Sequence, residues 1–195
     1  MNINYGRNYK EKFWNQCDNY LIENYIERIS YRDREAFGKL YELTKSAVYG
    51  FALSIIKNVD DAEDVLHEVY IKIYDNACKY QYCGKPMAWI LTITKNVAYN
   101  KLKMRKHTEN IDEMLEILAS NENITVENKI ILEIAFKNIT DEERNILVLH
   151  IVAGLKYREI AKFMNIPLST VLSKYHRTIK KLKLMFSQED VFYER

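Results

Sequence analysis

Hydroxyl and basic side chains are concentrated on one face of a predicted helix near the carboxyl end of the chain. Hydroxyl groups and Arg can hydrogen-bond to the edges of DNA bases, and Lys and Arg neutralise phosphates. Less polar residues recur on the opposite face at helical spacing, which turns the polar groups outward. The predicted inward-facing residues are Val171, Tyr175, Thr178 and Leu182. The predicted duplex-contacting residues are Ser169, Thr170, Ser173, Lys174, Arg177, Lys180 and Lys181.

The segment before this helix has the pattern of a helix-turn-helix motif. Residues 157–164 predict a short helix, and residues 165–168 interrupt it. Ser169 is a suitable N-cap for the final helix, and Gly154 marks the end of the helix that precedes both. Two helices joined by a tight turn, the second with a basic face, favour DNA binding. The alternative is a helical hairpin whose basic face is merely solvated.

A second group of candidate binding residues lies between positions 80 and 103. Residues 80–83 form a short aromatic loop, and Pro86 begins a predicted helix that extends to Arg105. Aromatic platforms beside basic residues suit single-stranded nucleic acid, whose bases expose stacking faces. The alternative is structural, because Tyr is common throughout the chain and Trp89 is expected to anchor the helix in the core. The candidate residues are Tyr80, Gln81, Tyr82, Lys95, Asn96, Asn100 and Lys103.

An acidic helix is predicted from Asp61 to Tyr74. Asp60 offers an N-cap with Glu63 three residues later, which is a capping-box pattern. Acidic side chains on such a helix commonly form a solvated face. The other interpretation is a docking surface for a basic partner, and the composition of the helix leaves both open.

Residue types that catalysis or metal binding requires are present but not suitably arranged. The four His residues are scattered, and the three Cys residues lack CxxC spacing. The chain has no HExxH or GxSxG motif and no glycine-rich phosphate loop. The neighbouring carboxylates Asp60 and Asp61 are better explained by helix capping than by metal binding. We therefore expect no enzymatic activity, no metal and no cofactor.

Helical spacing of apolar residues dominates the whole chain. Apart from the segments above, the predicted helices are residues 21–29 and 36–55 and a helix with a capping box from Thr140 to Glu143. Strand-like alternation is absent, and five Gly and two Pro are too few for a turn-rich β architecture. The sequence therefore predicts an all-α fold.

A polar, acidic stretch divides the predicted helices into two groups. Residues 108–127 hold six acidic residues and no Lys or Arg, which is typical of a flexible linker. Basic residues cluster on both sides of it, although the net charge is only +2. The predicted organisation is an extension at 1–19, a helical domain at 20–107, the linker at 108–127, a helix-turn-helix domain at 128–186 and a tail at 187–195.

The sequence has no pattern that would direct the chain out of the cytoplasm. The first residues lack the basic and then apolar order of a signal peptide. No uncharged apolar stretch approaches the roughly 18 residues of a membrane span. We therefore expect a cytoplasmic protein that does not insert into membranes.

Four segments, taken in order, resemble the extracytoplasmic-function (ECF) sigma factors, the small two-domain sigma subunits of bacterial RNA polymerase in the sigma-70 superfamily. Residues 33–41 resemble the opening of their region 2, and residues 61–70 resemble their polymerase-docking helix. Residues 85–96 are similar to the helix that engages the melted minus-ten element, and residues 154–171 resemble the region 4 helix-turn-helix. The resemblance covers roughly residues 20–185.

The resemblance implies a protein that binds core RNA polymerase and directs promoter recognition, DNA melting and transcription initiation. Its docking helix would bind core polymerase through Asp61, Asp64 and Glu68. The aromatic loop and the helix after it would hold the melted minus-ten element. The helix-turn-helix would bind the minus-thirty-five duplex, and an anti-sigma factor would be a further partner.

Two other functions remain open on the sequence alone. A helix-turn-helix transcriptional regulator could bind duplex operators without docking on core polymerase, its first domain sensing a ligand or a partner. An anti-sigma-like interaction protein is the third hypothesis. Transcription in the presence of purified core polymerase distinguishes a sigma factor from a regulator of this kind and from an anti-sigma-like protein.

Overall fold

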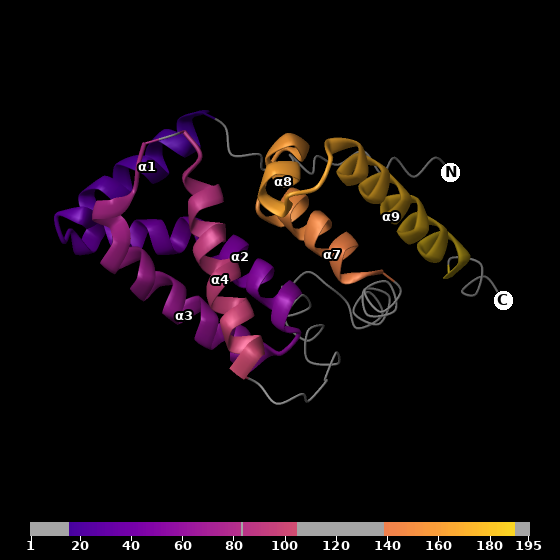
Figure 1. Ribbon diagram of the computed structural model, residues 1–195, viewed down its shortest axis with the longest axis horizontal. Coiled ribbons are helices and arrows are strands. Elements are labelled where there is room, and N and C mark those ends of the chain that lie inside the picture. Colours follow the sequence, from indigo (N-terminus) through magenta and orange to yellow (C-terminus); the bar gives the residue numbers. More distant parts are fainter. Residues whose placement is uncertain (1–15, 83, 105–138, 190–195) are drawn as a thin grey trace, which may run out of the picture.

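Helices form nearly all of the described part of the chain (Figure 1). The computed structural model describes residues 16–82, 84–104 and 139–189. The first helical group comprises α1 (Gln16–Ser30), α2 (Arg34–Ile56), α3 (Val59–Asn76), the short 3₁₀ helix η1 (Ala77–Lys79) and α4 (Pro86–Met104). The second group comprises α7 (Asp141–Leu147), the π-helix η2 (Val148–Val152), α8 (Tyr157–Met164) and α9 (Leu168–Glu189). No strand occurs in these ranges, and the predicted all-α fold is confirmed.

Several predictions concern residues that the structure does not describe. They include the linker at 108–127, most of the extension at 1–19, the end of the tail at 190–195 and Arg105, the predicted last residue of the helix from Pro86. The domain boundaries that depend on these residues stay predictions.

Helix α2 is the centre of the first group. Much of its length is buried, and both of its ends are capped. The carboxylate of Asp33 caps it by accepting hydrogen bonds from the backbone N–H groups of Glu35 and Ala36, at 2.9 and 3.1 Å. Lys57 ends it in the left-handed conformation, with φ 58°. Helices α1, α3 and α4 pack around α2. This bundle supports the acidic face of α3 and the polar face of α4.

Helix α3 begins two residues earlier than its sequence pattern predicts. The side-chain oxygen of Asn58 accepts a hydrogen bond from the backbone N–H of Asp61 at 2.9 Å, so Asn58 is the N-cap. The predicted capping box from Asp60 to Glu63 is therefore wrong. Asn and Asp cap helices about equally well, so residue type did not distinguish the two positions. Asp60 lies in the first turn, where its negative charge interacts favourably with the positive end of the helix dipole.

The second group contains the predicted helix-turn-helix. Helix α8 has the predicted bounds, and Asn165 ends it with a positive φ of 56°. The capping box of α7 is confirmed. The backbone N–H of Thr140 donates to the Glu143 carboxylate at 2.9 Å, and the backbone N–H of Glu143 donates to the Thr140 hydroxyl at 3.3 Å. Gly154, which follows η2, has a φ of 64°, a conformation that favours glycine at a helix end.

Helix α9 begins at Leu168 rather than after Ser169. The carbonyl of Pro167 accepts hydrogen bonds from the backbone N–H groups of Thr170 and Val171 at 3.0 and 3.1 Å, so Pro167 occupies the N-cap position. The predicted N-cap at Ser169 is wrong, and Ser169 lies exposed in the first turn. The predicted inward face is confirmed, since Val171 and Thr178 are buried, and Tyr175 and Leu182 are partly buried.

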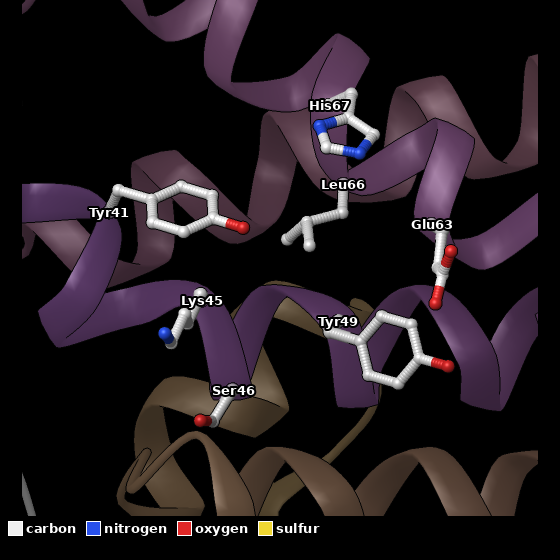
Figure 2. Close-up of a pocket in the computed structure, with 7 residues that line it drawn as sticks. All are labelled: Tyr41, Lys45, Ser46, Tyr49, Glu63, Leu66 and His67. Atoms are coloured by element: carbon white, nitrogen blue, oxygen red, sulfur yellow. The ribbon is translucent and has the colours of Figure 1, made fainter. Parts of the chain in front are cut away.

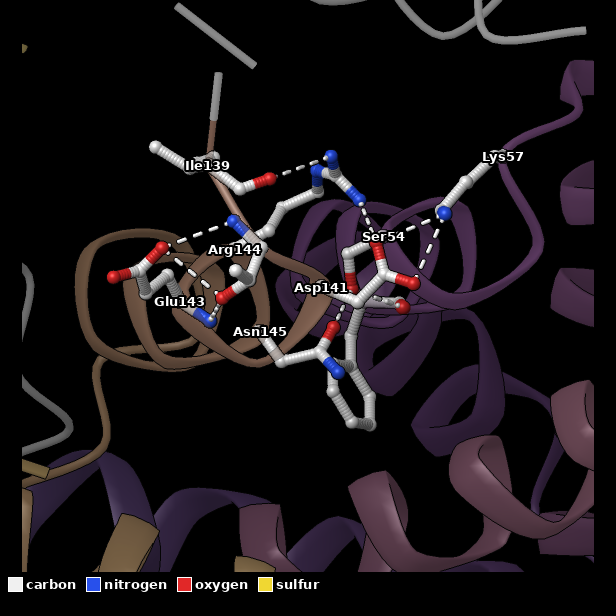
Figure 3. Close-up of polar contacts among 9 residues, drawn as sticks. Ser54, Lys57, Ile139, Asp141, Glu143, Arg144 and Asn145 are labelled. Atoms are coloured by element: carbon white, nitrogen blue, oxygen red, sulfur yellow. Dashed lines mark hydrogen bonds and ion pairs between the residues drawn. The ribbon is translucent and has the colours of Figure 1, made fainter. Parts of the chain in front are cut away.

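The two helical groups pack on each other through the carboxyl-terminal half of α2. Helices α7 and η2 contact α2, and α8 contacts α4. The Ser54 hydroxyl donates to the side-chain oxygen of Asn145 at 2.9 Å, and the Lys57 ammonium pairs with the Asp141 carboxylate at 2.9 Å (Figure 3). Buried apolar residues of both groups form one continuous core. The sequence does not predict this packing, because a linker separates the groups and leaves their arrangement open.

Replacing Phe163 with Ala should loosen the packing between the two groups. Its ring meets that of Phe51 with centroids 5.6 Å apart, and such a pair contributes about 0.5–1.5 kcal/mol beyond the buried area. We expect an increased radius of gyration in small-angle scattering. Phe37→Ala is the matched control, because Phe37 is also partly buried but packs on two tyrosines of α3. The control should lower the melting temperature at an unchanged radius, and an equally compact Phe163→Ala variant would contradict the prediction.

Candidate nucleic-acid interface

The aromatic loop between η1 and α4 exposes two of its three predicted binding residues. Gln81 and Tyr82 are exposed, whereas Tyr80 is partly buried. The ring of Tyr80 packs edge-on against Trp89, at 5.1 Å between centroids, and against Tyr82, at 5.8 Å. Trp89 itself packs against the core but is only partly buried, so it is less of an anchor than the sequence predicts. The loop therefore presents Tyr82 as its accessible aromatic ring.

Glu23 of α1 holds this loop in place. Its Oε1 atom accepts a hydrogen bond from the Tyr80 hydroxyl at 2.7 Å and another from the backbone N–H of Gly84 at 2.9 Å. The residue is buried, with 9% of its surface exposed. Glu23 was not among the residues predicted from the sequence. The available signal was a carboxylate among the apolar positions of α1, between Ile22 and Ile26.

Helix α4 brings three of its four predicted binding residues to the surface. Asn96, Asn100 and Lys103 are exposed. Lys95 is only partly exposed, because its ammonium lies 5.4 Å from the centroid of the Phe163 ring on α8. The second helical group therefore covers one side chain that the sequence assigns to nucleic-acid binding.

The exposed face of α9 carries most of the residues predicted to contact duplex DNA. Its exposed members are Ser169, Ser173, Arg177, Lys180 and Lys181. Thr170 is partly buried, and Lys174 is only 23% exposed because its ammonium pairs with Glu142 of α7 at 2.8 Å. Arg177 pairs with Glu143 at 3.1 Å and still keeps 67% of its side chain exposed. The two carboxylates of α7 are partners that the sequence did not predict.

Glu143 remains ionised beside Arg177. Burial disfavours its charge, but hydrogen bonds from Thr140 and the Arg177 guanidinium outweigh that cost and hold the pKa of Glu143 below its usual value. An ionised carboxylate competes with a DNA phosphate or base for the same guanidinium. A contact between Arg177 and DNA would therefore compete with the ion pair to Glu143.

The acidic residues of α3 form an exposed face joined to α4. Asp64 and Glu68 are exposed and Asp61 is partly exposed. The Lys101 ammonium of α4 pairs with Asp61 at 3.2 Å and with Asp64 at 2.6 Å. Its hydrogen bond and charge hold the pKa of Asp64 below its usual value. Glu68 pairs with Lys72 one turn along α3, at 3.2 Å. This face is thus anionic but partly balanced by lysines.

A groove of about 470 Å³ lies between α2 and α3, beside the acidic face (Figure 2). It is lined by Tyr41, Lys45, Ser46, Tyr49, Glu63, Leu66 and His67. Burial raises the pKa of Tyr49 to about 12, and no hydrogen-bond partner for its hydroxyl is present among the described residues. The mixture of aromatic, aliphatic and charged groups suits a side chain projecting from a partner protein.

The described residues offer neither a metal site nor a membrane span. In 16–82, 84–104 and 139–189, no group of three or more His, Cys, Asp or Glu side chains could hold a metal ion. None of the helices in these ranges is both long and apolar enough to cross a membrane.

Comparison with known protein families identifies both helical groups. The family model for sigma-70 region 2 matches residues 40–108, and a family model for sigma-70 region 4 matches residues 135–182. The first match contains the acidic helix, the aromatic loop and α4. The second contains the helix-turn-helix. The two matches occur in the same order as the segments of the sequence that resemble region 2 and region 4.

Curated relatives are similar over most of their length. The ECF RNA polymerase sigma factor SigK of Mycobacterium tuberculosis (strain H37Rv) is 24% identical over 172 residues, covering 83% of this chain and 91% of that protein. The ECF RNA polymerase sigma factor SigW of Bacillus subtilis (strain 168) is 24% identical over 181 residues, covering 84% and 95%.

Solved structures share the fold. CnrH in complex with the cytosolic domain of CnrY matches with a TM-score of 0.61 at 16% identity, covering 86% of this chain and 98% of that chain. The sigma factor RpoE of Bartonella quintana, in complex with the anti-sigma factor NepR, matches with a TM-score of 0.60 at 17% identity, covering 77% and 96%. With both sigma-70 regions present in order and ECF sigma factors as relatives, the chain belongs to the sigma-70 superfamily, and within it to the ECF sigma factors.

Proposed function

We propose that this chain binds core RNA polymerase and directs it to promoters, where it takes part in DNA melting and transcription initiation. One observation carries the proposal. An exposed acidic helix, an exposed aromatic loop and a helix-turn-helix with a basic outer face occur in one chain, within the two sigma-70 regions. No single feature separates this function from other DNA-binding functions, but the three together do.

The acidic face of α3 is the proposed docking surface for core polymerase. Asp61, Asp64 and Glu68 lie on it, and the groove between α2 and α3 adjoins it. Exposed carboxylates attract a basic partner at long range, and a neighbouring groove with apolar groups supplies the area that a stable complex buries. The two features support a protein partner rather than a solvated face.

The aromatic loop and the exposed face of α4 are the proposed contact with the melted minus-ten element. Tyr82 offers a ring for stacking, and Gln81, Asn96 and Asn100 offer amides for unpaired base edges. Lys95 and Lys103 add positive charge for the backbone. Duplex DNA hides the faces of its bases, so this combination is best suited to a single strand.

The exposed face of α9 is the proposed contact with the minus-thirty-five duplex. Ser169, Thr170 and Ser173 lie near the start of the helix, where residues of a helix-turn-helix reach base edges. Lys174 and Arg177 would exchange their α7 carboxylates for DNA. Lys180 and Lys181, further along, are placed to meet phosphates.

The packing of the two groups restricts one residue of the proposed promoter contact. The Lys95 ammonium lies 5.4 Å from the centroid of the Phe163 ring in the packed arrangement, and its side chain is only partly exposed, so α8 limits its access to DNA. Full access of DNA to Lys95 would need the two groups to move apart at this contact. Polar contacts such as Ser54–Asn145 and Lys57–Asp141 can be replaced by water at small cost, whereas the apolar core that the two groups share opposes such a movement.

The same proposal accounts for partners and location. Because the proposed partners are core polymerase and promoter DNA, the proposed location is the cytoplasm. The chain would contribute binding energy to initiation rather than a catalytic step. RpoE of Bartonella quintana and CnrH were solved as complexes, the first with an anti-sigma factor. We include an anti-sigma factor among the proposed partners on this ground.

Run-off transcription with purified core polymerase tests the proposed function. Promoter fragments are selected from genomic DNA by binding to the holoenzyme, and each is transcribed with core alone and with core plus this chain. We expect discrete transcripts only when the chain is present. A chain that binds duplex DNA but gives no transcripts would instead be a helix-turn-helix regulator.

A further inference from the structure

We propose that Glu23 of α1 is a positioning residue, which fixes the aromatic loop so that Gln81 and Tyr82 can receive an unpaired base of the non-template strand. The proposal rests on the proposed function and extends it. It assigns a role to a helix that precedes the region 2 match at residues 40–108. It also divides the loop residues into those that hold the loop and those that contact DNA.

The contacts of Glu23 bracket the exposed part of the loop. One carboxylate oxygen accepts from the Tyr80 hydroxyl before it and from the Gly84 backbone N–H after it, at 2.7 and 2.9 Å. Between these two points, Gln81 and Tyr82 are exposed. A single carboxylate oxygen therefore bonds to residues on both sides of Gln81 and Tyr82, and both of these side chains stay accessible.

Tyr80 is a structural member of the loop. Its hydroxyl is bound by Glu23, and the two edge-on contacts with Trp89 and Tyr82 occupy its ring. A ring held on this many sides offers little of its face to a base. Tyr82, with 58% of its surface exposed, is the aromatic residue that remains for stacking.

A second carboxylate of α1 supports the same arrangement. Glu27 lies one helical turn after Glu23, on the same side of the helix. Desolvation of the phenol and a hydrogen bond with Glu27 raise the pKa of Tyr82 to about 12. Glu23 and Glu27, which are four residues apart on α1, thus bond to Tyr80 and Tyr82 respectively.

Preorganisation is the physical reason for such a device. A free loop loses conformational entropy when it closes on a base, and that loss weakens binding. Here the folded protein has already fixed the loop, through hydrogen bonds to a charged acceptor, which are stronger than neutral ones. The carboxylate needs no contact with DNA to have this effect.

Binding of holoenzyme to fork-junction DNA tests the proposal. The probe is a duplex with a randomised single-stranded non-template overhang, from which wild-type holoenzyme selects its preferred sequence. Glu23→Ala should bind the selected overhang about tenfold more weakly, comparable to losing one stacked base, and lose its preference at one overhang position. Glu23→Gln should retain most of the affinity, since an amide oxygen can accept both hydrogen bonds. Tyr80→Phe, which removes one donor, should fall between them.

Three measurements separate positioning from general destabilisation. Circular dichroism melting and affinity for core polymerase should match wild type for Glu23→Gln and Tyr80→Phe. Glu42→Ala, which removes an exposed carboxylate on α2, is the control for lost charge and should bind the overhang normally. Wild-type selectivity in Glu23→Ala would overturn the proposal. So would a loss spread evenly over all overhang positions and core affinity.

Failure of the function and failure of the inference have different signatures. If wild-type holoenzyme selects no overhang sequence, the proposed function is wrong and the role of Glu23 falls with it. If wild type selects a sequence and Glu23→Ala selects the same one with equal affinity, only the inference is wrong.

Discussion

A chain in which Asp64 and Glu68 are both replaced with Lys should fail to associate with core RNA polymerase. Both side chains are exposed on α3, so the change alters the surface and not the buried face of the helix. Like charges placed opposite each other at an interface cost several kcal/mol, which corresponds to a loss of affinity of about a hundredfold or more. Pull-down with purified core enzyme measures the loss, and circular dichroism verifies that helical content is unchanged.

The structure sharpens this experiment through the Lys101 ion pairs. In the double variant, the ammonium introduced in place of the Asp64 carboxylate would face Lys101, while Asp61 keeps its own pair with Lys101. Lys101 is partly exposed and keeps its Asp61 partner, and the Asp64 side chain that is lost is 70% exposed, so folding should persist. Glu42→Lys combined with Glu35→Lys is the matched control, because both residues are exposed on α2 and the change in net charge is identical. Retained binding by the α3 variant, or equal loss in the control, would remove the docking assignment.

Local features of the fold followed from the sequence because each depends on a few neighbouring residues. The bounds of α8, the capping box at Thr140 and the inward face of α9 were all predicted from spacing and residue type. Where two residues suitable as N-caps lay close together, spacing alone did not determine which of them begins the helix. Asn58 caps α3 instead of Asp60, and the Pro167 position caps α9 instead of Ser169.

Features that join distant parts of the chain could not be predicted in the same way. Glu23 lies 57 residues before Tyr80, and Ser54 lies 91 residues before Asn145. Helical periodicity places a residue on a face but does not say which other helix that face meets. For this reason Lys174 was predicted to be outward and available, although an α7 carboxylate holds its ammonium. The pairing changes how DNA would be bound without moving the helix face.

Val171→Lys should unfold the helix-turn-helix, whereas Ser173→Lys, two positions along the same helix, should leave it folded. Val171 is fully buried against the core, and Ser173 is exposed. The first variant loses the burial of a Val side chain, worth about 1.5–3 kcal/mol, and forces a charge into an apolar site at a cost of several kcal/mol more. The sum is comparable with the total stability of a small domain, which is about 5–15 kcal/mol. The second variant should change stability by no more than about 0.5 kcal/mol.

Two variants on the exposed face of α9, Ser173→Lys and Arg177→Ala, should affect DNA binding in different ways. Ser173→Lys adds a positive charge to the face proposed to meet the minus-thirty-five duplex, so it should strengthen non-specific duplex binding and steepen the dependence on salt. Because it also removes a hydroxyl proposed to reach base edges, it should reduce the preference for promoter sequence. Arg177→Ala should keep the fold, because the backbone and hydroxyl of Thr140 still bond Oε2 of Glu143, and it should weaken promoter binding. If Arg177 contacts a guanine, that loss is about 1–3 kcal/mol and is confined to one base position. Thermal melting of the full chain and salt-titrated duplex binding measure both effects. A stable Val171→Lys protein beside an unfolded Ser173→Lys protein would mean that α9 turns its other face to the core, and the residues proposed to contact DNA would then have to be sought elsewhere.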